Sequence, residues 1–339
     1  MSEGKNMKSA VLFKQTVSFP EQIEIAMGKD LPEIPKADKV CICGMGTSAL
    51  AGEILADFTD GTADMPLYVI RRTEFPNWVD ENTWIILVSY SGNTRETLTA
   101  YDEAIRRKCK IICVSSGGDL YSKCLNRKDI AVSLPGGMQS RVALGSMLGC
   151  LASILEVMGV CTAKTELEKI VPILKEERDN IIKEGNDIAR DIALKLVDKI
   201  PVIYSLANMR SSAIRWKTQI NENSKNISFC GSIPEFNHNE IVGWTDDSVN
   251  SQNFVPVMLY DDNASDMIKS MTDTSISILS DKNLDIITHH VEGSNNLEKN
   301  LKCIILGDIV SIYLADLSGT DPVTEKPIRE VRDRANMSP

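Results

Sequence analysis

The sequence predicts an α/β protein made of two similar halves, each a parallel sheet flanked by helices, of the flavodoxin-like or Rossmann-like kind. Three observations predict this fold. From Val40 onward, short apolar runs alternate with amphipathic stretches, which is the pattern of strand, helix and strand units. A charged helical run over residues 162–199 interrupts the pattern, and the alternation starts again at Pro201. At 339 residues, the chain has room for two such domains.

In the first half, the apolar runs predict strands and the amphipathic stretches between them predict helices. The expected strands are 40–44, 66–71, 83–90, 110–116 and 129–135, and the expected helices are 47–58, 94–108, a short one near Leu120, and 141–159. Helices that separate successive strands imply a parallel sheet. The helix over 141–159 is apolar on most faces, so we expect it to pack between layers or against a second subunit.

The second half repeats this organisation after the charged run. Its expected strands are 201–206, 253–260 and 285–293, and its expected helices are 209–225, 265–282 and 296–317. We therefore divide the chain into an N-terminal domain with a helical N-terminal segment, a helical connector and a C-terminal domain. These parts are expected over 1–160, 161–199 and 200–339.

Composition narrows the function. Acidic residues outnumber basic ones 47 to 37 and the net charge is −10, so nucleic acid is an unexpected partner. No apolar run reaches the ~18 residues of a membrane span and no signal peptide is recognisable, so we expect a cytoplasmic protein that does not bind membranes. The nine cysteines include no C-x-x-C pair, which predicts reduced thiols and no metal site.

Residues Gly44–Ala49 follow the first strand directly and fit the G-x-G-x-x-A pattern of dinucleotide sites. The amides of the following helix and the hydroxyls of Thr47 and Ser48 could hold an anion. An NAD site would have an acidic residue after the next strand, where Arg71 and Arg72 stand, so NADP stays open. A simple strand-to-helix turn with a capping serine is the other interpretation.

A second candidate site follows a later strand, in the sequence SYSGNTRET over 89–97. Ser89, Ser91 and Thr94 supply hydroxyls, a glycine frees the backbone, and the next helix begins here, which together form a neutral cradle for a phosphate dianion. A capping box formed by Thr94 and Thr97 would explain only one of the three hydroxyls.

Three further residues are candidates for chemistry. Arg141 begins a strongly apolar helix, where its guanidinium requires an anion unless it is a surface side chain. Glu222 lies at the end of a predicted helix, whose dipole raises the pKa of a carboxyl there and suits a base, although a solvated glutamate is the simpler interpretation. His238, in a polar loop, is an acid or base candidate or a structural histidine. His289 and His290 receive no role.

These motifs resemble a known family. GMGTS with SYSGNTRET is similar to the signature of sugar isomerase (SIS) domains, which bind phosphosugars. Together with PGGMQSRVALG, RWKTQINENSK and EFNHNEIVGW, in this order, the chain resembles the bifunctional phosphoglucose/phosphomannose isomerases, a branch with two SIS domains.

The resemblance implies an isomerase, without a cofactor, that interconverts glucose 6-phosphate, and mannose 6-phosphate, with fructose 6-phosphate. It implies Glu222 as the base, Arg141 as the group that stabilises an enediolate, and His238 as a helper in ring opening that reaches the neighbouring subunit's site in a homodimer. The residues implied to bind the phosphate or sugar are Gly46, Thr47, Ser48, Ser89, Ser91 and Thr94.

The chain departs from the family pattern in two places. The family has Gly-Gly-Ser where this chain has Gly46-Thr47-Ser48, which narrows the space beside the ligand. A family lysine that helps ring opening aligns with Arg332, and Lys326 lies six residues earlier. Arginine donates hydrogen bonds but does not readily release a proton.

Two other classes of function remain. A phosphosugar sensor would use the same cradle without chemistry, although the ~39 residues before the first strand are too few for a helix-turn-helix module. An NADP-dependent oxidoreductase would account for the first motif but not for SYSGNT. The sequence leaves open the ratio of glucose to mannose activity and whether the natural substrate is an amino sugar phosphate.

Overall fold

The computed structural model describes residues 3–246 and 251–336. Helices α1 (Glu3–Val17) and α2 (Phe19–Met27) precede a five-stranded parallel sheet with the strand order β2-β1-β3-β4-β5. Its strands are β1 (Val40–Gly44), β2 (Tyr68–Ile70), β3 (Trp84–Val88), β4 (Lys110–Ser115) and β5 (Ile130–Ser133). All five lie within strands expected from the apolar runs.

Helices cover both faces of this sheet. They are α3 (Gly46–Thr59), α4 (Arg95–Arg106), α5 (Gly118–Arg127) and α6 (Leu144–Val157), the last preceded by the 3-10 turn η1 (Ser140–Val142). Alternate residues of each strand point to opposite faces. Ile42 and Ile86 join the core under α3 and α6, whereas Cys43 and Leu87 join the core under α4 and α5. Burial of both faces explains why the strands are almost wholly apolar.

The second sheet has four parallel strands in the order β7-β6-β8-β9. The elements of this half are α7 (Ala163–Ile182), α8 (Ile188–Lys195), β6 (Ile200–Leu206), η2 (Ala207–Met209), α9 (Arg210–Gln219), η3 (Ile220–Ser224), β7 (Phe229–Ile233), η4 (Glu235–His238), α10 (Glu240–Thr245), η5 (Ser251–Asn253), β8 (Phe254–Asp261), α11 (Asp266–Asp281), β9 (Ile287–Val291), α12 (Asn296–Leu317) and α13 (Lys326–Asn336). Strand β7 is absent from our sequence-based expectations. Its sequence FCGSI is short and contains glycine and serine, because β7 is an edge strand with partly exposed residues.

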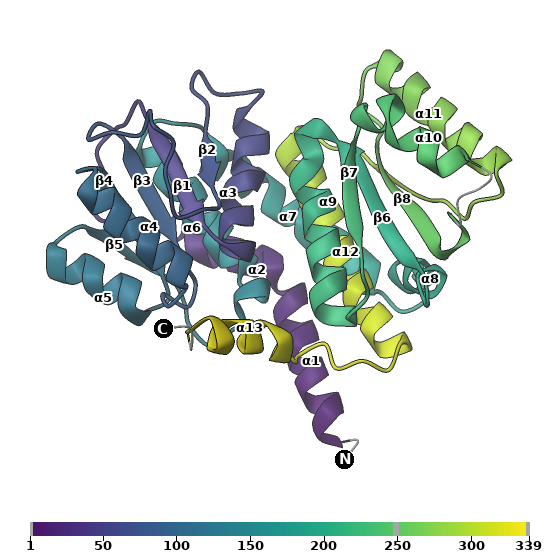
Figure 1. Cartoon of the computed structure of the whole chain (residues 1–339), viewed down its shortest axis with the longest axis horizontal. Coiled ribbons are helices and arrows are strands. Elements are labelled where there is room, and N and C mark those ends of the chain that lie inside the picture. Colours follow the sequence, from purple (N-terminus) through teal and green to yellow (C-terminus); the bar gives the residue numbers. More distant parts are fainter. Residues whose placement is uncertain (1–2, 247–250, 337–339) are drawn as a thin grey trace.

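The two sheets lie side by side, with helices of both halves packed between them (Figure 1). Helix α3 of the first half contacts α9 and α12 of the second, and one apolar core continues from Ile86 in β3 to Ile203 in β6. The backbone N–H of Ser211, at the start of α9, donates to Asp57 on α3 at 2.9 Å. This contact fixes α9 against the first half, and with it the residues that follow α9.

For the apolar helix expected over 141–159, the structure shows packing between layers of the same chain, which is one of the two arrangements that we expected, and it removes the argument for a second subunit. Helix α6 is buried from Leu144 to Leu155, and α2, α3 and α7 of the same chain cover it. Its apolar surface therefore requires no second subunit. The covering layer comes from α2, which lies far from α6 in sequence, and from α7, which is the next helix along the chain.

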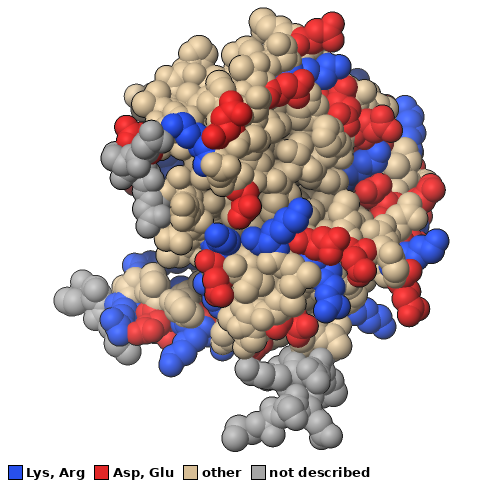
Figure 2. Space-filling view, turned by 90° about the vertical axis from the view of Figure 1, so that its right-hand side faces the viewer, with Lys and Arg blue, Asp and Glu red and all other residues tan. Residues whose placement is uncertain are grey.

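The surface carries charges of both signs. On the face shown in Figure 2, lysine and arginine are interspersed with aspartate and glutamate around a broad area of uncharged residues. All nine cysteines are free thiols. Over 3–246 and 251–336, no cluster of three or more histidine, cysteine, aspartate or glutamate side chains is arranged to hold a metal ion. Within the same residues, every helix is too short or too polar to cross a bilayer.

Candidate active site

The two hydroxyl-rich loops meet at the carboxyl edge of the first sheet. They follow β1 and β3, which are neighbouring strands, so their ends are adjacent. The hydroxyl of Ser48 accepts a hydrogen bond from the Tyr90 amide at 3.4 Å, which joins the loops. Ser89 donates to the hydroxyl of Thr94 at 3.0 Å. The structure thus brings both predicted anion motifs into one place, where α3 and α4 also begin.

Glycine is required where these loops pack closely. Gly44 allows β1 and β3 to approach, since a Cβ there would lie 2.8 Å from the Val88 carbonyl oxygen. Gly92 has φ +69°, and a Cβ on it would lie 1.8 Å from the Gly117 carbonyl oxygen. No side chain fits at either position. Thr94 forms no side-chain cap on α4, so the capping-box interpretation does not explain its hydroxyl.

Arg71, the residue that kept an NADP site open, has a partner in its own chain. Its guanidinium forms two hydrogen bonds to Glu53, at 2.6 and 2.7 Å, and a third to the Gly46 carbonyl at 3.3 Å. These contacts hold the first loop against α3. The position of Arg71 therefore needs no phosphate of a dinucleotide to explain it.

Arg141 is buried, with a side chain only 2% exposed, so it is not the surface arginine considered above. It lies in η1, after β5, at the same sheet edge as the two loops. Its Nε donates to the side chain of Asn223 at 2.9 Å, and its Nη1 lies 3.9 Å from the Glu222 carboxylate. The structure therefore joins Arg141 of the first half to Glu222 of the second.

Glu222 lies in the π-helical turn η3, directly after α9. Its side chain is 29% exposed. Burial raises the pKa of the Glu222 carboxyl, while the positive charges of Arg141 and Arg215 act in the opposite direction. A carboxylate with a raised pKa beside a fixed cation is suited to removing a proton from carbon and keeping it until it is returned.

Arg215 connects the parts of this site, and sequence reasoning missed it. From α9, it forms two hydrogen bonds of 2.7 Å to Asp308 on α12, and both side chains are buried. It also donates to the Arg141 carbonyl at 2.7 Å and lies 3.5 Å from the Thr47 hydroxyl. Asp308 is an acidic residue within the apolar run IILGDIV, and this unusual position is the signal in the sequence from which a buried basic partner could have been predicted.

Tyr90 is a second residue that sequence reasoning missed. Its hydroxyl donates to the Pro135 carbonyl at 2.8 Å and accepts from the Met138 amide at 3.2 Å. The loop between these residues leads into η1. Tyr90 therefore ties the second hydroxyl loop to the segment that carries Arg141.

His238 lies far from Glu222 in the same chain. Glu222 precedes β7 and His238 follows it, so the two residues are at opposite ends of this five-residue strand. At ~3.3 Å per residue, the strand alone spans about 16 Å. His238 is exposed.

Arg332 and Lys326 lie in the C-terminal tail, and Lys326 directly follows Glu325, whose carboxylate accepts a hydrogen bond from Arg141. Both lie on α13, whose side chains are exposed over 326–335. The lysine beside Glu222 is instead Lys225, whose Nζ donates to the carbonyls of Glu222 and, at 3.0 Å, Thr324. Burial lowers the pKa of Lys225, and the nearby charge of Arg141 lowers it further.

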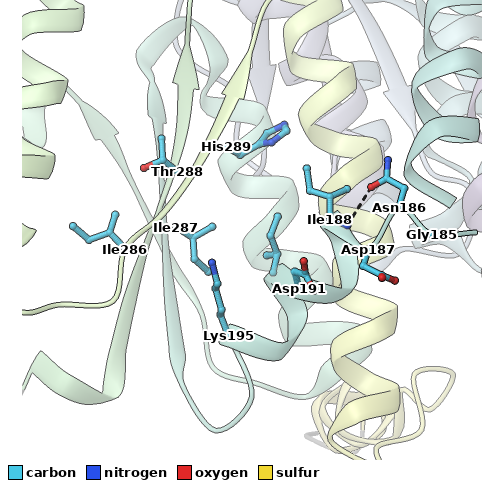
Figure 3. Close-up of a pocket in the computed structure, with 11 residues that line it drawn as sticks. Gly185, Asn186, Asp187, Ile188, Asp191, Lys195, Ile286, Ile287, Thr288 and His289 are labelled. Carbon is cyan, nitrogen blue, oxygen red and sulfur yellow. Dashed lines mark hydrogen bonds between the residues drawn. The ribbon is translucent and has the colours of Figure 1, made fainter. Parts of the chain in front are cut away.

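A separate cavity of about 510 Å³ lies between α8 and β9. Figure 3 shows Asp191 and Lys195 on the helix and His289 on the strand among the side chains that line it. Burial lowers the pKa of His289 to about 4, so this imidazole is neutral at pH 7. None of the predicted site residues lines this cavity.

Comparison with known proteins agrees with this architecture. Residues 33–158 match the SIS domain family, and residues 186–334 match the bacterial phospho-glucose isomerase C-terminal SIS domain. The C-terminal domain of glucosamine-fructose-6-phosphate aminotransferase from Francisella tularensis has the same fold, with a TM-score of 0.69 at 16% identity over 91% of this chain and 97% of that one. The fold and the site thus define a protein of two SIS domains.

Two curated relatives are similar over most of their length. The bifunctional phosphoglucose/phosphomannose isomerase of Aquifex aeolicus is 34% identical, over 87% of this chain and 89% of that protein. The one of Caldicellulosiruptor bescii is 33% identical, over 95% and 98%. The chain belongs to the bifunctional phosphoglucose/phosphomannose isomerase family. The family predicted from the motifs is therefore confirmed.

Proposed function

We propose that this protein interconverts glucose 6-phosphate, and mannose 6-phosphate, with fructose 6-phosphate. The observation that carries the proposal is the buried Arg141 beside Glu222, at the sheet edge where the two hydroxyl loops meet. A sensor that only binds a phosphosugar would not need a carboxylate with a raised pKa next to a buried cation. Family membership supports the same reaction.

In the proposed reaction, the hydroxyls of the loops and the amides at the starts of α3 and α4 bind the phosphate. The residues assigned to it are Gly46, Thr47, Ser48, Ser89, Ser91 and Thr94. This role needs no lysine, because helix amides and hydroxyls supply enough donors for a dianion. The phosphate then orients the sugar chain toward Glu222.

The chemical step is a proton transfer between two carbons. Glu222 removes the proton from C2 of the open-chain aldose, the C2–H electrons form the C1=C2 bond, and the carbonyl electrons move to O1. Arg141 stabilises the resulting negative charge of the enediolate. The hydroxyl proton on O2 then moves to O1, the O2 electrons form the C2=O2 carbonyl, and the electrons of the C1=C2 bond take the proton back from Glu222 at C1, which gives the ketose. No electron acceptor takes part, so the proposed reaction requires no cofactor.

We assign ring opening to His238 of a second copy, in a homodimer with shared sites. The support is geometric, since His238 and Glu222 of one chain lie at opposite ends of β7. Along edge strand β7 and its neighbouring segments, three large apolar side chains are exposed: Ile227 and Phe229 at the end nearer Glu222, and Val242 after His238. An exposed apolar group around a sheet edge fits a contact between copies. A cytoplasmic location and a place in glycolysis or gluconeogenesis are part of this proposal.

The proposal predicts that both C2 epimers are substrates. Removing the C2 proton from either sugar erases that stereocentre, so both epimers give the same enediolate. We expect deuterium placed at C2 of glucose 6-phosphate or mannose 6-phosphate to be partly transferred to C1 of fructose 6-phosphate, as measured by NMR or mass spectrometry. EDTA should leave both rates unchanged. Complete failure with the mannose epimer would restrict the function to glucose 6-phosphate.

The shared site predicts complementation between two inactive variants. Glu222→Gln and His238→Ala homodimers should both be nearly inactive. After subunit exchange, each heterodimer has one site with both residues intact and one site with both defects. We expect part of the wild-type activity to return, in proportion to the heterodimer measured by native mass spectrometry. Confirmed exchange without any activity would show that His238 acts within its own chain or not at all.

A further inference from the structure

A short segment of the C-terminal tail, residues 322–325, accepts hydrogen bonds from the guanidinium of Arg141. Nη1 of Arg141 donates to the Glu325 carboxylate, and Nη2 donates to the Pro322 carbonyl at 2.6 Å and, at 3.5 Å, to the Val323 carbonyl. These tail residues lie more than 180 positions away in the sequence. With Asn223 on Nε, every nitrogen of the guanidinium has an acceptor in the protein.

The buried charge explains why an acidic residue lies here. A guanidinium that is 2% exposed cannot rely on water, and a buried charge without a counter-ion is strongly destabilising. Glu222, 3.9 Å away, is too far for a hydrogen bond. Glu325 is therefore the hydrogen-bonded counter-ion of Arg141 in the unliganded chain.

The same nitrogen atoms are the ones that an enediolate needs. The negative oxygen of that intermediate and the Glu325 carboxylate cannot both pair with Nη1 of Arg141, because two anions would then share one donor nitrogen. We propose that Glu325 is a positioning residue that holds Arg141 in the unliganded enzyme and leaves it to the negative oxygen of the intermediate. This inference rests on the proposed isomerase function.

The surroundings of Glu325 permit such an exchange. Behind it, the Val323 carbonyl accepts from Gln139 at 3.2 Å and the Val323 amide donates to Asp321 at 2.9 Å, which fixes the first part of the tail. Beyond it, α13 is exposed over 326–335. The Glu325 side chain is itself 26% exposed. Glu325 thus lies at the boundary between a fixed segment and a solvent-facing helix, where its side chain can turn away.

The exchange predicts selectivity for negative charge at the reacting end of the ligand. A ligand with an anion at that end replaces one counter-ion with another, whereas a neutral ligand leaves Glu325 in place. The charged groups around Glu222 are Arg141, Arg215, Lys225 and Glu325, and of these only Glu325 raises the pKa of Glu222. Removing the charge of Glu325 should therefore also lower the pKa of the Glu222 carboxyl.

The test compares Glu325→Gln with the wild-type protein using two inhibitors. An aldonate 5-phosphate carries a carboxylate in place of the enediolate, and a hexitol 6-phosphate is neutral at the same end. We expect the variant to bind the aldonate about tenfold more tightly, because a charged hydrogen bond no longer has to be displaced, and the hexitol within about twofold of wild type. The matched control is Glu330→Gln, which removes a negative charge on α13 that pairs with Arg334. It should change the affinity for neither inhibitor.

A pH profile separates this role from a structural one. The acid limb of kcat/KM reports the pKa of the base in the free enzyme. In Glu325→Gln that limb should move to lower pH, because the pKa of Glu222 falls when its negative neighbour is removed. Loss of packing alone would not move the limb in this direction. If Glu325→Gln does not fold, Glu325→Asp takes its place, because its shorter side chain holds the carboxylate farther from Arg141. It should also bind the aldonate more tightly and move the acid limb of kcat/KM to lower pH, both by a smaller amount.

Equal changes in the affinities for both inhibitors, or no change in the aldonate affinity, would overturn the inference while leaving the isomerase intact. Absence of any isomerase activity in the wild-type protein would instead overturn the proposed function. The two failures are distinct because inhibitor binding is measured by calorimetry, without turnover.

Discussion

Glu222→Gln is expected to lower kcat for glucose 6-phosphate and fructose 6-phosphate by at least ~100-fold, while KM changes little. The amide has the shape of the carboxylate but cannot accept the C2 proton. Arg141 and the hydroxyl loops remain, so the phosphosugar should still bind. Steady-state kinetics, together with calorimetric titration of a nonreactive hexitol phosphate, measures both quantities.

The matched control is Glu176→Gln, which makes the same change at an exposed position on α7. Its activity should equal that of the wild-type protein. Near-normal turnover of Glu222→Gln would show that another group removes the proton, and the assignment of the base would be wrong. Thermal unfolding of both variants confirms that the comparison is made between folded proteins.

Arg141→Lys is expected to lower kcat by about 10²- to 10³-fold, the range measured when one fixed donor to a developing oxyanion is removed. Lysine keeps the positive charge but not the planar fork of donors. It cannot reach Asn223, Pro322 and Glu325 at once as the guanidinium does. The charge would therefore be poorly placed for the enediolate, although substrate binding through the phosphate should persist.

Arg106→Lys on α4 is the control, since Arg106 is an exposed arginine that pairs with Glu103 on the same helix. It should leave kcat unchanged. Because Arg141 is buried, Arg141→Lys is also expected to lower the melting temperature, so activity must be measured well below it. Full activity of a folded Arg141→Lys protein would remove Arg141 from the stabilisation of the intermediate.

Much of this molecule follows from local sequence. The strands of the first sheet are continuous apolar runs because helices bury both faces, and such runs are recognisable without a structure. The two loop motifs are equally local, since Gly44 and Gly92 are the residues that their backbone contacts require. The family identity followed from these motifs and from the segments that contain Glu222 and His238.

The failures concern contacts between segments that are distant in sequence. Helix α6 has the composition of an interface helix, yet α2, which lies far from it in sequence, covers it within one chain. Strand β7 has no apolar run because it lies at the sheet edge. The hydrophobic periodicity of α6 and β7 does not predict these placements, since the placement of each segment depends on which other element packs against it.

The sequence by itself thus determined the two α/β halves, the two hydroxyl-rich loops and the family. The tertiary structure alone decided which charged groups meet. Arg141 and Glu222 are separated by 81 positions, and Arg215 and Glu325 join them from α9 and the tail. The physical reason is that strands, turns and helix starts depend on neighbouring residues, whereas a buried charge is placed by partners that the packing of helices and sheets brings to it.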